Sequence, residues 1–474
     1  MKQTLTKIVA TLGPTTGTLP SVRALAKAGV NVFRLNLSHG DHSTLSDWVR
    51  NIRIVEREMG CFLGILLDLQ GPKIRVGRLG PEGLRLRKGA TVVFSTHKKP
   101  ASGIIPVQFE KFHKSVGPGD RVYLNDGQFC VRVESVSGRE VTAQVINGGL
   151  LTDFKGINLP DAKLSESPLT PKDRKDLAFG LEQKVDFVAL SFVGRAADIT
   201  QLRKLIQAQG GDVDIVAKIE RRQAVENIES IVEVSDVVMV ARGDLGIEIP
   251  LAEVPVVQRK ILTVCARQSR PVIIATQMLE SMIENARPTR AEASDVANAV
   301  FCKADAVMLS GETAAGKYPV AAVKVMVETL KEAESYLVET ERNGITTRES
   351  LADFPINKGI ALTAVRMTGW LNAQAIVVFT QSGGTAKMVS SFHPMVPLFA
   401  FTARQAQARK LVLIRGVFPI WVDNKISFVE DMSELFEILK SKRWLNRGDR
   451  VIVTTGLPLG IPNWTNVIRV ETVS

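Results

Sequence analysis

The sequence predicts an α/β protein: a (β/α)8 TIM barrel with a small β-barrel-like lid domain inserted in one loop and an open α/β domain at the C-terminus. Short β-branched apolar runs alternate with amphipathic stretches of helical length, which indicates parallel strands joined by crossover helices. Eight such runs precede residue 310, and eight strands close a barrel of this kind. One gap between runs, residues 70–166, is too long for a crossover helix.

The predicted barrel strands are short and rich in Val, Ile and Ala. They are 6–10, 30–35, 62–68, 185–190, 214–218, 236–240, 271–275 and 305–309. The predicted barrel helices are 18–28, 42–59, 171–184, 196–208, 221–234, 251–269, 289–302 and 319–335. Together they predict a catalytic barrel made of residues 1–69 and 167–340.

The two remaining regions predict two further domains. Residues 70–166 show period-two alternation with turn signals, which favours antiparallel strands in an inserted β domain, here called the lid domain. Residues 341–474 begin with a polar linker and a helix at 358–371, followed by strands at 375–379, 397–401, 417–422, 450–454 and 466–470. We expect this C-terminal domain to be an open α/β sheet with a regulatory role.

Composition excludes several classes of protein. The chain has 474 residues, of which 45% are hydrophobic and 23% charged, and at about 150 residues per domain this length suggests three domains. No apolar run approaches the roughly 18 residues of a membrane span, the N-terminus lacks the apolar core of a signal peptide, and the four cysteines form no CxxC pair. We therefore expect a cytoplasmic protein with no membrane partner.

The net charge of +11 is compatible with nucleic-acid binding or with attraction of anionic metabolites. Basic residues are spread along the chain, and aromatic residues make up only 6% without basic–aromatic interleaving. We therefore expect small anionic substrates and no nucleic-acid partner.

Polar side chains follow most of the predicted barrel strands. In a barrel enzyme these positions meet at one mouth and carry the catalytic groups. They are Arg34, Asn36, Ser38, Asp68, Lys218, Glu220, Arg242, Asp244, Thr276, Gln277, Ser310 and Glu312, with Arg75 just inside the lid domain. Any single one of them is more often an ordinary solvated charge, but their coincidence favours an active site.

Glu220 and Asp244 follow neighbouring strands, and Mg²⁺ prefers one or two carboxylates with water and phosphate as its other ligands. The few histidines are too scattered for a zinc centre, and no serine triad is supported. The GETAAGK segment at 311–317 resembles a P-loop but is followed by Tyr318, so we interpret it as a barrel loop. The glycine-rich segment TQSGGTA at 380–386 is equally compatible with phosphate binding and with an ordinary turn before a helix at 385–392.

With these residues placed, the chain resembles the pyruvate kinase family from KIVATLGP at 7–14 through the last strand. The motifs that carry the resemblance occur in family order. They are FRLNLSHG at 33–40, LLDLQGPKIRVG at 66–77, KGINLP at 155–160, KIE at 218–220, ARGDLGIEIP at 241–250, ATQMLESM at 275–282, PTRAEASDVANAV at 288–300 and MLSGETAAGKYP at 308–319.

The resemblance implies phosphoryl transfer from phosphoenolpyruvate to ADP, giving ATP and pyruvate, the last step of glycolysis. It implies Mg²⁺, with Mn²⁺ as an alternative, bound by Glu220 and Asp244. The implied catalytic residues are Lys218, Arg34, Thr276 and Ser294, and Gly243 and Asp244 join the substrate contacts. The implied nucleotide-side residues are Asn36, Ser38, His39, Arg75 and Lys155.

The resemblance also implies regulation and assembly. Residues Thr380, Gln381, Ser382, Gly383, Gly384 and Thr385 match the loop that binds a sugar-phosphate activator in this family. Family members are usually homotetramers, so a homotetramer is expected.

The family's monovalent-cation pocket corresponds to Asn36, Ser38, Asp68 and Leu69. Position 69 lacks the hydroxyl of potassium-dependent members, and Lys73 stands where they carry Glu. The Lys73 ammonium is therefore expected to act as an internal cation, so that K⁺ is not required. The alternative is an exposed Lys73 at the lid hinge.

Two other functions remain open from the residues alone. A metal-dependent aldolase would use the carboxylates without a nucleotide lid or the Arg34 and Arg75 phosphate pair. A non-catalytic basic binding protein would not need Lys218, Glu220 and Asp244 together.

Overall fold

The computed structural model describes residues 4–38, 40–97, 103–161, 167–341, 355–422, 432–456 and 464–474. Its centre is a closed barrel of eight parallel strands in the order β1-β16-β15-β14-β13-β12-β3-β2. The strands are β1 (Lys7–Thr11), β2 (Val32–Asn36), β3 (Gly64–Leu69), β12 (Phe187–Leu190), β13 (Asp214–Ile219), β14 (Val237–Ala241), β15 (Val272–Ala275) and β16 (Ala306–Leu309). All eight predicted strands and the predicted fold class are confirmed.

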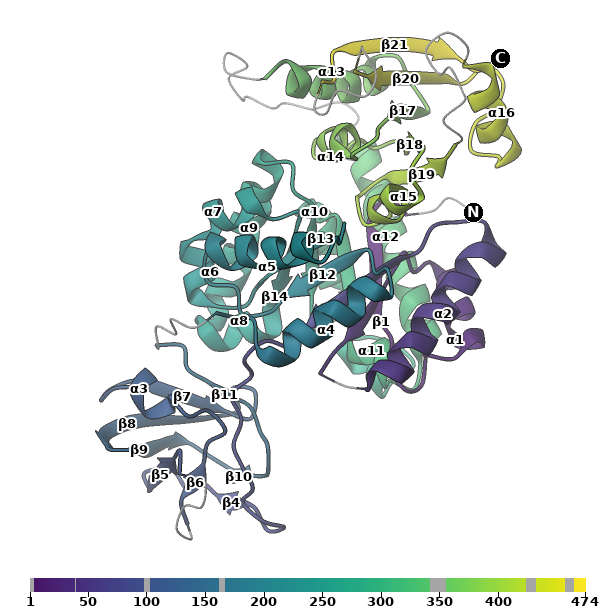
Figure 1. Cartoon of the computed structure of the whole chain (residues 1–474). Helices are drawn as coiled ribbons and strands as arrows, with labels where there is room; N and C mark the ends of the chain where they lie inside the picture. The colour runs from purple at the N-terminus through teal and green to yellow at the C-terminus, as the bar shows by residue number, and fades with distance from the viewer. Residues whose placement is uncertain are drawn as a thin grey trace.

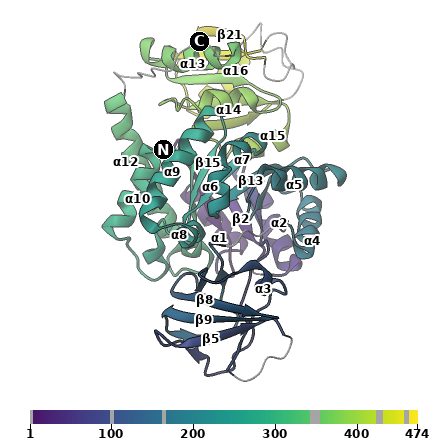
Figure 2. The ribbon, with the colours of Figure 1, turned by 90° about the vertical axis from the view of Figure 1, so that its left-hand side faces the viewer.

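Helices surround the barrel on its outer face (Figure 2). They are α1 (Leu19–Ala28), α2 (His42–Met59), α4 (Pro171–Glu182), α5 (Ala196–Ala208), α6 (Arg222–Glu226), α7 (Ile228–Val234), α8 (Arg242–Glu248), α9 (Val254–Arg267), α10 (Arg290–Phe301), α11 (Gly311–Ala314) and α12 (Pro319–Glu341), with 3-10 turns at Leu251–Glu253 and Glu280–Ile283. Capping boxes define the N-termini of two helices: Thr170 with Asp173 at the start of α4, and Thr289 with Glu292 at the start of α10.

One helix prediction was wrong in detail, and a short helix next to the strand ends was not predicted. The stretch 221–234 is not one helix, because it divides at Asn227 into α6 and α7. Arg242 and Asp244 follow the end of β14 as expected, but they lie in the first turn of the short helix α8 rather than in a loop.

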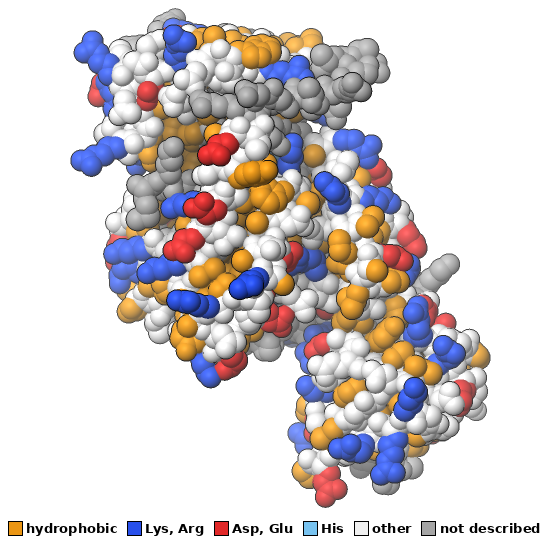
Figure 3. All heavy atoms as spheres, turned by 180° about the vertical axis from the view of Figure 1, so that it is seen from behind, with side chains coloured by type: hydrophobic (Ala, Val, Ile, Leu, Met, Phe, Trp, Pro, Cys, Tyr) orange, Lys and Arg blue, Asp and Glu red, His pale blue; other side chains and the backbone are white. Residues whose placement is uncertain are grey.

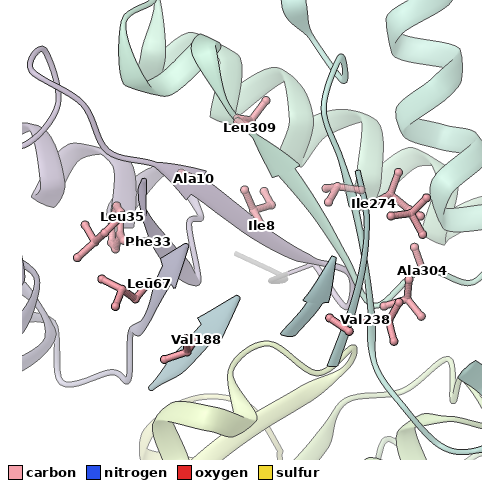
Figure 4. Close-up of a cluster of buried hydrophobic side chains, with 14 of the residues drawn as sticks. Ile8, Ala10, Phe33, Leu35, Leu67, Val188, Val238, Ile274, Ala304 and Leu309 are labelled. Carbon is pink, nitrogen blue, oxygen red and sulfur yellow. The ribbon is translucent and has the colours of Figure 1, made fainter. Parts of the chain in front are cut away.

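Alternate strand residues build the two hydrophobic layers of the barrel. Residues such as Ile8, Phe33 and Val188 belong to the layer packed against the helices (Figure 4). Their neighbours along each strand, such as Val9 and Phe187, form a separate interior cluster. Because both faces are apolar, the strands are continuous apolar runs, which is why they can be recognised in the sequence.

The lid domain extends from one end of the barrel (Figure 1). It contains a six-stranded sheet, β11-β7-β8-β9-β5-β6, and a small pair, β10-β4. The elements are β4 (Leu84–Arg85), β5 (Thr91–Ser95), β6 (Ile105–Pro106), α3 (Phe112–Ser115), β7 (Arg121–Leu124), β8 (Phe129–Ser137), β9 (Glu140–Asn147), β10 (Leu150–Leu151) and β11 (Ile157–Asn158). The strands pair antiparallel as predicted except β5 and β6, which are parallel.

The C-terminal domain lies at the other end of the barrel (Figure 1). Its five-stranded sheet has the order β19-β18-β17-β20-β21, and only β21 is antiparallel to its neighbour. The elements are α13 (Ile356–Trp370), β17 (Ala375–Phe379), α14 (Gly384–Ser390), β18 (Leu398–Thr402), α15 (Gln405–Leu411), β19 (Val417–Trp421), α16 (Ser433–Ser441), β20 (Arg450–Thr455) and β21 (Val467–Thr472). All five predicted strands are confirmed.

The two appended domains meet opposite ends of the barrel strands. Gly127 of the lid domain lies against Ile247 of α8, which follows the carboxyl end of β14. At the amino ends, the Gly416 N–H of the C-terminal domain donates to the Leu5 carbonyl. The polar strand ends therefore face the lid domain. No helix in the described part of the chain is long and apolar enough to cross a membrane.

Buried ion pairs join the C-terminal domain to the barrel. Asp214 begins β13 and accepts from Lys387 Nζ of α14 at 2.9 Å, and Lys410 Nζ of α15 lies 3.1 Å away. Burial alone raises the pKa of Asp214, but the two lysines outweigh it and hold that pKa below its usual range. The carboxylate therefore stays ionised and its two lysines stay paired.

Asp214→Asn is expected to destabilise the protein by about 3 kcal/mol, because it leaves Lys387 without its carboxylate and leaves Lys410 with only the exposed Asp212 as a partner. The depressed pKa means that this stabilisation is fully present above the unfolded-state pKa of about 3.9 and is lost only as the pH falls through the lower folded-state value. Thermal unfolding from pH 5 to 8 should therefore show a constant gap between wild type and variant.

Asp212→Asn is the matched control. Asp212 also pairs with Lys410, at 2.8 Å, but its side chain is 63% exposed. Its loss should cost less than about 1 kcal/mol. Equal effects of the two substitutions, or a gap for Asp214→Asn that closes between pH 7 and 5, would contradict this account.

Candidate active site

Asp68 is the centre of the site at the carboxyl ends of the strands. It is the fifth residue of β3, and its side chain is 2% exposed. Its Oδ2 accepts from Arg34 Nε of β2 at 2.7 Å, and its Oδ1 lies 3.3 Å from Lys218 Nζ of β13. The Thr11 hydroxyl accepts a further bond from Arg34 Nη1 at 3.1 Å. One buried carboxylate thus holds two cations from two other strands.

Lys218 is held by three oxygens. Its ammonium lies 2.8 Å from Glu220 Oε1 and donates to Ser191 Oγ at 2.6 Å, in addition to the Asp68 contact. Burial alone lowers the pKa of Lys218, but the charges of Asp68 and Glu220 outweigh it and raise that pKa above its usual value. The pKa of Asp68 is lowered despite burial, because Lys218 and Arg34 favour its charged form. Both groups are therefore charged.

Glu220 and Asp244 have the properties of a divalent-cation site. Burial raises the pKa of Glu220, and the nearby charge of Asp244 raises it further against the effect of Lys218. The Glu220 Oε2 also accepts from the Phe192 N–H at 2.8 Å. Two mutually repelling carboxylates in a buried setting fit Mg²⁺, which takes few protein ligands, whereas no cluster of three or more ligating side chains occurs among the described residues.

Thr276 and Gly243 meet beside this cluster. The Thr276 hydroxyl accepts from the Gly243 N–H at 2.7 Å and donates to the Ala275 carbonyl at 2.6 Å. Thr276 has φ +69°, a left-handed conformation that is unusual for a β-branched residue. Arg242 stabilises this turn, because its Nη2 donates to the Thr276 carbonyl at 2.7 Å. The turn therefore holds the hydroxyl in one position.

Ser294 lies at the start of the second turn of α10 and is exposed. Its neighbour Asp295 pairs with Arg242 at 2.7 Å, which brings α10 to the Thr276 turn. Among the described residues, Ser294 has no hydrogen bond to Thr276. The structure brings the two predicted residues into one region through Arg242 and Asp295.

Arg75 and Lys155 lie together on the side of the lid domain next to the barrel. Arg75 bridges to Gly156 and donates from Nη1 to the Phe154 carbonyl at 2.9 Å, while the Val76 N–H donates to the Lys155 carbonyl. Arg75 and Lys155 therefore lie on neighbouring segments of the lid domain.

Gly71 forms part of the connection from β3 to the lid domain. Its φ is +68°, and a Cβ there would lie 2.7 Å from the Phe192 ring. The chain can therefore leave the barrel tightly against Phe192, next to Glu220.

The residues of the predicted monovalent-cation pocket lie on β2 (Asn36), in the turn after it (Ser38) and on β3 (Asp68 and Leu69). The Asn36 side-chain carbonyl accepts from the Ser38 N–H at 3.1 Å, and Leu69 is fully buried. Lys73 is exposed, with its Cε 3.6 Å from the position that a Cβ on Gly156 would take. His39 lies outside the described residues.

The predicted phosphate loop connects β17 to α14. Gly383 has φ +84° and its N–H donates to the Thr380 hydroxyl at 2.9 Å, and a Cβ there would lie 2.5 Å from the Gln407 amide. Gln381 and Ser382 are exposed, Gly384 begins α14, and the Thr385 hydroxyl contacts that of Thr465 at 2.8 Å. The loop lies far from the barrel mouth, at the end of the molecule that contacts the amino ends of the strands.

Sequence reasoning missed three residues of the site. Ser191 holds Lys218 and donates to the Leu69 carbonyl, Thr11 holds Arg34, and Asp295 holds Arg242. Ser191 and Thr11 stand at strand ends, so the rule that identified Asp68 could have found them. Asp295 lies on a helix and has no comparable signal.

Both the barrel and the C-terminal domain match known protein families. Residues 3–323 match the family model "Pyruvate kinase, barrel domain", and residues 358–471 match "Pyruvate kinase, alpha/beta domain". A pyruvate kinase of Agrobacterium vitis is 41% identical over 98% of this chain and 97% of its own length, and one of Clostridium acetobutylicum is 38% identical over 99% of both. A crystal structure of a pyruvate kinase from Cryptosporidium parvum has a TM-score of 0.91 and 33% identity, covering 100% of this chain and 97% of that one.

Glu220→Gln is expected to weaken Mn²⁺ binding at least tenfold in the absence of any substrate, because it removes one of the two carboxylates predicted to bind the cation. Electron paramagnetic resonance of free Mn²⁺ measures this directly. Glu253→Gln is the control, since Glu253 is exposed at the start of α9. Unchanged Mn²⁺ affinity in Glu220→Gln would exclude Glu220 as a ligand.

Proposed function

The chain belongs to the pyruvate kinase family and is therefore a phosphotransferase, and on this premise we propose that it moves the phosphoryl group of phosphoenolpyruvate to ADP with a divalent cation. The products are ATP and enolpyruvate, which is then protonated to pyruvate. The observation that carries the proposal is the buried cluster in which Asp68 and Glu220 hold Lys218, and Asp68 also holds Arg34. Fixed cations of this kind stabilise the charge that moves between oxygens during phosphoryl transfer.

Arg34 and Lys218 bind the phosphoryl group in this proposal. The guanidinium of Arg34 is oriented by Asp68 and Thr11, so little conformational entropy is lost when it grips a phosphate. Lys218 is kept protonated by its carboxylate neighbours and neutralises charge on the transferring group and the developing enolate.

Glu220 and Asp244 would hold Mg²⁺ or Mn²⁺, which when bound supplies Lewis-acid polarisation of the substrate's carboxylate and enolate oxygens. The Gly243 N–H is engaged by Thr276, which ties the start of α8 to the same turn. Thr276 and Ser294 are suited to ordering the water that protonates enolpyruvate, since both carry hydroxyls on segments joined by Arg242 and Asp295.

The nucleotide occupies the space between the barrel mouth and the lid domain in this proposal. Arg75 and Lys155 would contact it from the lid domain, Asn36 from the end of β2, and Ser38 and His39 from the sequence that follows. Closure of the lid domain around Gly71 would exclude water from the transfer.

We propose that the chain has three functional parts: the catalytic barrel at 1–69 and 167–340, the lid domain at 70–166 and the regulatory domain at 341–474. We also propose a cytoplasmic enzyme of glycolysis that assembles as a homotetramer.

A coupled assay of pyruvate formation from phosphoenolpyruvate, ADP and Mg²⁺ tests the proposed reaction. Pyruvate production that requires all three is the expected result. Pyruvate released by cleavage of a larger keto acid, with no dependence on ADP, would instead indicate an aldolase.

Lys218→Met is expected to reduce kcat by at least about 100-fold, because a preorganised charge at the reacting group contributes on the order of 3 kcal/mol. Mn²⁺ binding through Glu220 and Asp244 should survive. Lys324→Met, which neutralises an exposed lysine of α12, is the control and should keep full activity. Near-normal turnover of Lys218→Met would refute its assigned role.

The Lys73 side chain is proposed to replace a bound K⁺. Lys73 is exposed in the described arrangement, and closure of the lid domain would bring the hinge that carries it toward the pocket of Asn36, Ser38 and Asp68. We therefore expect full activity without K⁺ at constant ionic strength, and a Lys73→Glu variant that is active only with K⁺. Strong stimulation of the wild type by K⁺ would show that Lys73 is only a hinge residue.

A sugar phosphate is proposed to activate the enzyme through the loop Thr380–Thr385. The loop leads into α14, whose Lys387 pairs with Asp214 at the start of β13. A ligand that shifts α14 would therefore act on the barrel strands through this ion pair. Ribose 5-phosphate or fructose bisphosphate is expected to lower the phosphoenolpyruvate concentration at half-saturation. A saturation curve that none of these compounds shifts would leave the loop with a structural role only.

A further inference from the structure

The lid domain is joined to the barrel by two connections. The outgoing connection follows β3 and passes through Gly71, and the returning connection ends at Thr170, where α4 begins. Seen from behind, the lid domain is set off from the barrel and joined to it over a narrow region (Figure 3). Any movement of the lid domain over the site therefore depends on how these two connections are held.

Asp173 holds both connections at the barrel. It is the third residue of α4 and is fully buried. Its Oδ1 accepts from the Gly71 N–H of the outgoing connection at 3.1 Å. Its Oδ2 accepts from the Thr170 N–H of the returning connection at 2.8 Å and from the Thr170 hydroxyl at 2.6 Å. One carboxylate thus joins two segments that are 99 residues apart in the sequence.

The outgoing connection is short between its two fixed ends. The Ile157 N–H donates to the Ile74 carbonyl at 2.9 Å, so the chain is already part of the lid domain at Ile74. Pro72 and Lys73 are the two residues between Ile74 and Gly71. The proline ring fixes its own φ, and the Lys73 N–H donates to the Gly71 carbonyl at 2.9 Å. Rotation of the lid domain on this side is therefore limited to a few backbone torsions next to the Asp173 contact.

Gly71 also packs against a residue that contacts the candidate metal site. A Cβ on Gly71 would lie 2.7 Å from the Phe192 ring, so the two segments are in close contact. The Phe192 N–H donates to Glu220 Oε2 at 2.8 Å. By holding Gly71, Asp173 therefore sets the position of the hinge relative to Glu220.

We propose that Asp173 is a positioning residue for phosphoryl transfer, because it fixes the barrel end of the hinge on which the lid domain closes over the nucleotide. This role rests on the proposed function, in which Arg75 and Lys155 contact the nucleotide from the lid domain. Arg75 lies two residues after Lys73, so its place over the site follows from the hinge. A fixed hinge reduces the orientations in which the lid domain closes, and less entropy is then lost when the nucleotide binds.

Asp173→Asn separates the two parts of this contact. The Asn carbonyl oxygen can still accept from Thr170, but the amide NH2 group then faces the Gly71 N–H and cannot accept its hydrogen. Asp198→Asn is the matched control. Asp198 is also buried and also caps a barrel helix, α5, where its Oδ2 accepts from the Gly194 N–H at 2.9 Å and the Arg195 N–H at 3.0 Å. Neither of these partners belongs to a connection of the lid domain.

Steady-state kinetics with each substrate varied in turn tests the role in the reaction. We expect Asp173→Asn to raise the KM for ADP at least about fivefold and to leave the KM for phosphoenolpyruvate within about twofold, because barrel residues bind the latter without the lid domain. Asp198→Asn should leave the ratio of the two KM values unchanged. Equal rises of both KM values, or a wild-type KM for ADP in a folded Asp173→Asn variant, would overturn the proposal.

Hydrogen–deuterium exchange of the unliganded full-length chain tests the hinge without the reaction. In the wild type, the peptide that contains Gly71 should exchange slowly, because the Gly71 N–H is bonded to a buried acceptor. Asp173→Asn should exchange there at least about tenfold faster, and Asp198→Asn should not. Fast exchange of this peptide in the wild type would overturn the proposal even if Asp173→Asn does not fold, and circular dichroism melting checks folding of both variants.

The two measurements separate failure of the hinge role from failure of the proposed function. A wild-type chain that forms no pyruvate from phosphoenolpyruvate and ADP would overturn the proposed function and, with it, the role of Asp173 in the reaction. A wild-type chain that forms pyruvate, with Gly71 exchange unchanged in Asp173→Asn, would overturn the hinge role alone.

Discussion

The buried carboxylate of Asp68 is the interaction on which the proposed active site depends. Arg34 and Lys218 come from β2 and β13, and without an anion between them their like charges would oppose the packing of these strands around β3. Burying three charged groups is costly, and the cost is recovered only when each charge is paired with good geometry. Glu220 and Ser191 complete that pairing around Lys218. The same arrangement that makes the cations tolerable in the barrel also orients them toward an anionic substrate.

Charged residues have different roles at the two ends of the barrel. At the carboxyl ends of the strands, charges converge on an open mouth beneath the lid domain, where they are available to a ligand. At the amino ends, charged residues form ion pairs between the barrel and the C-terminal domain. Asp214 pairs with Lys387 and Lys410, and Glu56 of α2 pairs with Arg409. These pairs fasten the C-terminal domain to the strands that carry the site. A single helix, α10, connects the two ends, since Asp295 in its second turn holds Arg242 and Lys303 follows its last turn.

Much of this architecture could be predicted from the sequence. The barrel strands are apolar on both faces, so runs such as 187–190 are continuous and bounded by polar residues, here Asp186 and Ser191. The strand-end rule found Asp68, Lys218 and Glu220 for the same reason. It also found Arg242 and Asp244, but it did not predict that they begin the seven-residue helix α8, because nothing in the local sequence distinguishes such a short helix from a loop after a strand.

Contacts between distant segments could not be predicted from the sequence. The hub role of Asp68 depends on the order in which β2, β3, β12 and β13 lie side by side, and only the closed barrel sets that order. The motifs that resembled a known family identified the residues of the site, but not which of them hold one another.

The most direct test of the central claim is a comparison of the thermal unfolding midpoints of Asp68→Asn, Lys218→Met and the double variant. If Asp68 is required because it separates and neutralises two buried cations, Asp68→Asn alone leaves Lys218 and Arg34 facing each other and costs about 3 kcal/mol. Removing Lys218 as well relieves that repulsion, so the double variant should melt above Asp68→Asn. A double variant that melts lower still, by the sum of the two single effects, would contradict the account.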